Sequence, residues 1–197
     1  MRFLGTAIIF LCLAVSAAPQ NPSHFANNFV KGLGYQITLP PDLVVNLEGS
    51  EEAAHGFTLD LLRPGDAHDW DRTPARYIAF GARFDTDEAG SLEAVIRQMT
   101  RNIENLVPLE LQGRGELRLA GTFPAKLGNL PANRLVLEYR NSEKQPTLRQ
   151  ILVAYRARPD ATAIIYVAIL NTTRIDFQQD LKTFTSILSG FQLTSVE

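Results

Sequence analysis

The sequence predicts an α+β fold in which an antiparallel sheet is sandwiched by helices. Three observations lead to this class: a succession of segments in which apolar and polar residues alternate, two stretches in which apolar residues recur at helical spacing, and one run that is apolar on both of its faces. Strands precede the first helix, longer strands follow it, and a helix comes last, an order typical of α+β proteins.

Four strands are expected before the first helix, at 35–39, 43–45, 56–62 and 76–84. The first stops at Pro40, and the second follows it at hairpin distance. In the last two, every second residue is apolar, so one face of each strand should point into a core. The residues expected on that face are Phe57, Leu59, Leu61, Ile78, Phe80, Ala82 and Phe84.

The first helix is expected directly after Gly90. Ser91 is the predicted N-cap because its hydroxyl can accept a hydrogen bond from a first-turn N–H, and Glu93 in that turn suits the helix dipole. Pro108 should end the helical segment. Its apolar stripe consists of Leu92, Val95, Ile96, Met99, Ile103 and Leu106.

Four more strands and a last helix follow. The strands are expected at 116–123, 134–140, 147–158 and 161–170. The last of them is apolar on both faces, so both faces must be covered, and it is predicted to lie in the centre of the sheet. Thr172 or Thr173 is the expected cap of the closing helix, and Gly190 should end it. The stripe of this helix consists of Phe177, Leu181, Phe184 and Leu188.

Four short motifs give the chain a resemblance to a known superfamily. They are 34–40 (GYQITLP), 91–94 (SLEA), 130–135 (LPANRL) and 184–191 (FTSILSGF). On these motifs the chain resembles the PsbP-like superfamily of DcrB and PsbP type. The resemblance implies an α-β-α sandwich around an antiparallel sheet. It implies much less about function, and no binding motif of one branch matches here, so no site residue is carried over.

The first residues have the layout of a secretory signal peptide. Arg2 supplies a positive start, 3–15 is uncharged and mostly apolar, and small residues follow. The cut is predicted after Ala17, because a cut one residue later would leave Pro19 next to the scissile bond. The apolar run is shorter than the about 20 residues of a spanning helix. We therefore expect a periplasmic or secreted protein with no membrane insertion after cleavage.

This expectation divides the chain into three parts: a signal peptide at 1–17, a flexible leader at 18–33 and one α+β domain at 34–197. Cleavage would remove the only cysteine, Cys12, so disulfides and thiol catalysis are not expected. The chain has a net charge of −2 and no basic cluster, so nucleic acid is not an expected partner. No cofactor is predicted, since no glycine-rich phosphate loop precedes either helix.

The loop at 65–72 is the segment richest in reactive side chains. Asp66, His68, Asp69 and Asp71 are of the types that bind divalent cations. Their spacing matches no established metal motif, so a solvated loop is the favoured interpretation and no metal site is predicted. Trp70 is a better candidate as an anchor for a protein partner, because aromatic side chains often dominate interfaces.

Other patterns have simpler explanations than a site. Residues 85–90 begin like a calcium loop, but Ala89 and Ile96 stand where oxygen ligands belong. Asn171 begins a glycosylation sequon, which matters only in a eukaryotic secretory pathway. The three histidines lie in loop-like stretches and no hydrolase motif is present, so no catalytic residue is predicted.

A polar strand face is the remaining candidate site. Arg134, Glu138 and Arg140 fall on one side of the strand at 134–140 and form a possible docking patch, with an ordinary solvent-facing sheet surface as the alternative. The function expected from the sequence is that of a non-enzymatic envelope protein that binds a protein partner. A periplasmic factor that binds a small ligand or a metal is the alternative.

Overall fold

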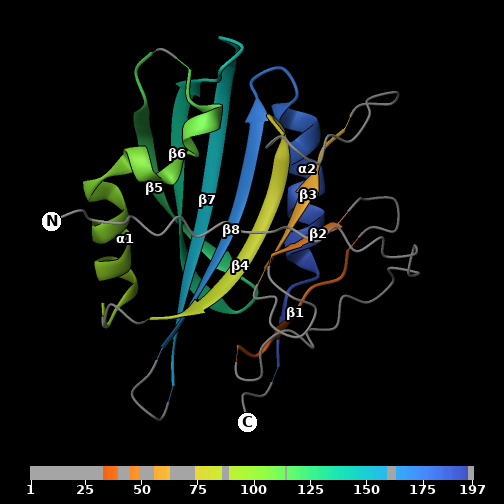
Figure 1. Cartoon of the computed structure of the whole chain (residues 1–197). Coiled ribbons are helices and arrows are strands. Elements are labelled where there is room, and N and C mark those ends of the chain that lie inside the picture. The colour runs from red at the N-terminus through yellow and green to blue at the C-terminus, as the bar shows by residue number, and fades with distance from the viewer. Residues whose placement is uncertain are drawn as a thin grey trace, which may run out of the picture.

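One antiparallel sheet of seven strands dominates the structure, a computed structural model that describes residues 33–39, 45–48, 56–62, 74–85, 89–113, 115–158 and 163–194. Figure 1 shows the strands side by side with one helix near each end of the sheet. Their spatial order is β2-β3-β4-β8-β7-β6-β5. The strands are β2 (Val45–Glu48), β3 (Gly56–Asp60), β4 (Tyr77–Phe84), β5 (Arg118–Leu127), β6 (Leu130–Arg140), β7 (Pro146–Ala157) and β8 (Ala163–Thr173).

The central place predicted for the doubly apolar strand is confirmed. β8 pairs with β4 on one side and with β7 on the other. Its side chains alternate between two separate cores: Tyr166 and Leu170 belong to one, and Ile165 belongs to the other. A strand with a core on each face has no polar side to present to water, which is why its sequence reads as a continuous apolar run.

The two cores lie on opposite faces of the sheet, and each is closed by one helix. On one face, α2 (Phe177–Ser189) contributes Phe184 and Ile187. On the other face, α1 (Leu92–Arg101) contributes Val95 and Ile96. The predicted α+β class, with an antiparallel sheet sandwiched by helices, is therefore confirmed.

The first helix begins as predicted but ends earlier than expected. The hydroxyl of Ser91 accepts a hydrogen bond from the N–H of Ala94 at 3.2 Å, so the predicted N-cap is confirmed. The α-helix ends at Arg101, and the remaining apolar positions fall in the short 3-10 helix Ile103–Leu106. A 3-10 turn keeps an apolar stripe nearly in line, so side-chain spacing alone did not reveal the change.

The threonines expected to cap the second helix are instead the end of β8, so that prediction was wrong. The N-cap is Asp176, and Thr173 donates a hydrogen bond from its hydroxyl to the Asp176 carboxylate at 2.6 Å. Three further residues separate the strand from the helix, because β8 continues beyond the expected end at residue 170. Gly190 does end α2, as predicted.

The first strand pairs with the end of the chain and not with its neighbour in sequence. β1 (Tyr35–Gln36) forms a separate two-stranded ladder with β9 (Gln192–Leu193). The hairpin expected between 35–39 and 43–45 is therefore wrong, and β2 pairs with β3. The ring centres of Tyr35 and Phe80 are 4.9 Å apart, so this ladder packs against the core on the α2 side of the sheet.

Within the described residues, no helix is long and apolar enough to cross a membrane.

A candidate docking surface on β5 and β6

The polar strand face predicted from the sequence forms part of a larger surface. On β6, Arg134 and Arg140 are exposed and Glu138 is partly exposed. The alternating residues Leu135, Leu137 and Tyr139 belong to the α1-side core. α2 packs against β8 and leaves part of the same face of β5 and β6 to solvent (Figure 1). Leu127 and Ala132, near the turn between these strands, are buried in the α2-side core. We call this surface the open face and define it by Arg118, Phe123, Arg134, Glu138 and Arg140.

Two of these residues come from β5, and a β-bulge puts them on the same side. Arg118 pairs with Glu138 and Phe123 pairs with Arg134, although the two β5 residues are an odd number of positions apart. The register shifts between Leu119 and Gly121, so one extra residue is accommodated there. Without the bulge, strict alternation would send Phe123 to the opposite face.

An ion pair crosses the two strands in the middle of the open face. The guanidinium of Arg118 donates a hydrogen bond to the carboxylate of Glu138, and this bond raises the pKa of Arg118 above its ordinary value. The Arg118 side chain is 63% exposed and that of Glu138 is 36% exposed. An exposed pair of this kind contributes little to stability, because water screens it. Its effect is to orient two charged groups on a rigid sheet.

An aromatic ring covers the bulge next to that pair. A Cβ atom on residue 121 would lie 2.7 Å from Cζ of Phe123, so the ring of Phe123 lies against Gly121. The guanidinium carbon of Arg134 lies 5.5 Å from the centre of the same ring. Phe123 is nevertheless 44% exposed. The ring is thus held on both sides while part of it stays available for contact.

At the end of the sheet the open face leads into a surface hollow of about 250 Å³. Its charged walls include Arg118, Glu138 and Arg140, and its lining extends to Pro146 and Leu148 on β7 and to Arg174 beyond β8. Arg140 and Arg174 are both exposed. The hydrogen bond from Arg140 Nη1 to the carbonyl of Lys144, at 3.0 Å, restrains one of these arginines.

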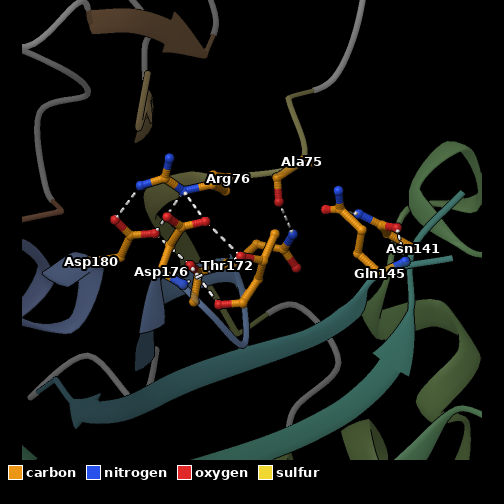
Figure 2. Close-up of polar contacts among 9 residues, drawn as sticks. Ala75, Arg76, Asn141, Gln145, Thr172, Asp176 and Asp180 are labelled. Carbon is orange, nitrogen blue, oxygen red and sulfur yellow. Dashed lines mark hydrogen bonds and ion pairs between the residues drawn. The ribbon is translucent and has the colours of Figure 1, made fainter. Parts of the chain in front are cut away.

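The same end of the sheet contains buried polar contacts that hold the fold together. Figure 2 shows Arg76 beside Asp176 and Asp180. Arg76 donates to both carboxylate oxygens of Asp180, at 3.0 and 2.7 Å, and the hydroxyl of Thr172 donates to the same carboxylate. These contacts join the start of β4, the end of β8 and the first turn of α2. We call them the α2 clasp.

A second buried cluster lies on the opposite face, around Asn171. Its side-chain oxygen accepts hydrogen bonds from Tyr139 at 2.8 Å and from Arg149 at 3.2 Å, and its amide donates to the carbonyl of Ala75 at 2.8 Å. Burial raises the pKa of Tyr139 to about 12, so its hydroxyl stays protonated and donates at neutral pH. Asn171 is 0% exposed, and a glycan at this sequon has no room in the folded protein.

Most of the other candidates from the sequence lie outside the described residues. This applies to Asp66, His68, Asp69 and Asp71, to Trp70, and to the predicted cleavage after Ala17. Among the residues that the structure describes, no group of three or more metal-ligating side chains is found.

Comparison with known proteins adds information about the fold alone. The sequence matches no protein-family model and no curated protein sequence. Its structure is similar to that of LpqN from Mycobacterium tuberculosis, with a TM-score of 0.53 and 14% identity over 82% of this chain and 83% of that chain.

Two weaker likenesses have TM-scores below 0.5. The Ran-binding protein Mog1p of Saccharomyces cerevisiae gives 0.44 at 10% identity, over 81% of this chain and 90% of that chain. The cyanobacterial PsbP of Synechocystis sp. PCC 6803 gives 0.41 at 13% identity, over 85% and 96%. The α-β-α sandwich implied by the PsbP-like resemblance is confirmed as the fold of this chain.

Proposed function

We propose that this chain is an exported protein of the cell envelope that acts by binding another protein through the open face. The observation that carries the proposal is the arrangement of that face. Three arginines, a glutamate and a partly exposed phenylalanine lie on adjacent paired strands and are not covered by either helix.

The composition of the open face favours a protein as the bound molecule. Arginine and aromatic side chains are enriched at protein interfaces and supply much of their binding energy. Phe123 is already fixed between Gly121 and Arg134, and Arg118 is already paired with Glu138. Side chains that are ordered before binding lose little conformational entropy when a partner arrives, so this surface is suited to recognition.

Two considerations support a place in the envelope. The first residues read as a cleavable secretory signal. LpqN, which shares the fold, is described as involved in cell envelope biogenesis. The similarity is limited to the fold, so the proposed compartment depends mainly on the signal-like first residues.

The buried polar side chains at the end of the sheet have a structural role and are not part of the proposed binding surface. Arg76, Asp180 and Asn171 each form several hydrogen bonds to groups of their own chain. Their hydrogen-bonding capacity is used in holding helix and strands together, whereas the charged groups of the open face are exposed.

Site-specific photo-crosslinking tests the proposal. A photoreactive phenylalanine analogue at position 123 is expected to give a discrete crosslinked protein species in cells that make the full chain. The control places the same analogue at Gln98, an exposed position of α1. The yield from position 123 should exceed that from position 98 severalfold. No discrete species at position 123, or equal yields at both positions, would contradict a partner on the open face.

A further inference from the structure

In the hollow next to the open face, a proline lies between two arginines, one on each side. Arg140 on β6 pairs with Pro146 on β7. The backbone N–H of Arg174, just beyond β8, donates to the carbonyl of Pro146 at 2.9 Å. Neighbouring strands are about 4.8 Å apart, so the Cα atoms of the two arginines are separated by about 10 Å. Because Pro146 has a short side chain, a gap remains between the two long ones.

The charges around this gap are unequal. Glu138 is engaged by Arg118. Neither Arg140 nor Arg174 forms an ion pair with a carboxylate of the described residues. The open face and hollow together therefore have an excess of positive charge, although the whole chain has a net charge of −2. A positive patch on an acidic protein is suited to a partner of opposite charge.

One apolar side chain lines the hollow, and another is the next residue after Arg174. Leu148 lines the hollow beneath the arginines. Ile175 follows Arg174 in the turn that leads to α2, and it is 91% exposed. A hydrogen bond from the hydroxyl of Thr173 to the carboxylate of Asp176 spans this turn. The exposed isoleucine is therefore presented from an ordered backbone.

We propose that the protein partner presents an acidic segment whose carboxylates bind Arg140 and Arg174 across Pro146. This inference rests on the proposed function and specifies the chemistry of the partner. A guanidinium can bind a carboxylate through two parallel hydrogen bonds, and a carboxylate placed in the gap is within reach of both long side chains. Apolar residues next to the acidic ones would contact Leu148 and Ile175.

The surface fits an acidic protein better than a phosphate polymer or an anionic membrane. Partly exposed Phe123 and exposed Ile175 offer apolar contacts that suit protein side chains.

The test combines photo-crosslinking from position 123 with two matched double variants. Arg140→Glu with Arg174→Glu reverses the charges of the gap. Arg97→Glu with Arg101→Glu makes the same change in net charge on exposed positions of α1. The first pair should lower the crosslinking yield about tenfold or more, because two charge-assisted contacts become repulsive. The second pair should leave the yield unchanged. Circular dichroism checks that both double variants are folded. If the Arg140→Glu, Arg174→Glu variant is not folded, Arg140→Gln with Arg174→Gln replaces it.

The outcomes separate this inference from the proposed function. Crosslinking that persists in the gap variant would overturn the acidic segment and leave partner binding in place. No crosslinking in any form of the protein would instead refute the proposed function.

A second arm uses the purified chain and defined probes: an oligoglutamate peptide, an oligolysine peptide, single-stranded DNA and vesicles of phosphatidylglycerol. The proposal is supported if the chain binds oligoglutamate alone, if salt weakens this binding, and if the Arg140→Glu, Arg174→Glu variant loses it. Preference for DNA or vesicles, or an unchanged affinity for oligoglutamate in the gap variant, overturns it.

Discussion

Replacing Asp180 with alanine is expected to lower the free energy of unfolding by about 3–5 kcal/mol. Asp180 is 2% exposed and accepts two hydrogen bonds from Arg76 and one from Thr172. Its removal takes the closest carboxylate away from the largely buried guanidinium of Arg76. The carboxylate of Asp176, 3.4 Å from Nε of Arg76, remains. Urea unfolding at neutral pH measures the change.

Two further variants make the Asp180 prediction specific. Gln179→Ala changes an exposed neighbour on the same helix and should shift stability by less than about 0.5 kcal/mol. Combining Asp180→Ala with Arg76→Met should cost less than the two single changes added together, because both members of the main buried pair are then removed. A loss below about 1 kcal/mol for Asp180→Ala would show that the α2 clasp does not hold the helix to the sheet.

Asn171→Ala is expected to lower the free energy of unfolding by about 3 kcal/mol, since two buried groups and one partly buried group each lose a partner. The groups are the hydroxyl of Tyr139, the guanidinium of Arg149 and the carbonyl of Ala75. Arg149 is 5% exposed, and its other hydrogen bond goes to the hydroxyl of Tyr77. Truncating Asn171 thus removes one of the uncharged hydrogen-bond acceptors of the buried guanidinium of Arg149.

Tyr139→Phe is the matched control for Asn171, because it removes one of the three hydrogen bonds and keeps the ring. It should cost about 1 kcal/mol, and urea unfolding under the same conditions compares the two variants. The account of the Asn171 cluster is wrong if both variants lose the same stability, since the contacts to Arg149 and Ala75 would then contribute nothing.

The parts of the fold that sequence predicts well are those set by local periodicity. The central strand was recognised because both of its faces are apolar, and each helix was recognised by its stripe. The β1–β9 ladder was missed because its partners lie at opposite ends of the domain, where no local pattern links them. The α2 clasp was missed for the same reason, since Arg76 and Asp180 are 104 positions apart.

The candidate surface was predicted in part. Alternation along β6 was enough to group Arg134, Glu138 and Arg140. Arg118 and Phe123 were not connected to that group, because the bulge between Leu119 and Gly121 breaks the alternation on β5. The glycine at the bulge was the available signal, since an isolated glycine in a strand often marks such a site. Arg174 could not be assigned to this surface from the sequence, because β8 continues three residues beyond its predicted end.

Hydrogen–deuterium exchange on the complex with the crosslinked partner tests the central claim most directly. The claim is that this protein acts through the open face. The prediction is slower exchange in β5 and β6 when the partner is bound, with α1 unchanged. Protection confined to α1 or α2, with β5 and β6 exchanging as in the free protein, would contradict it.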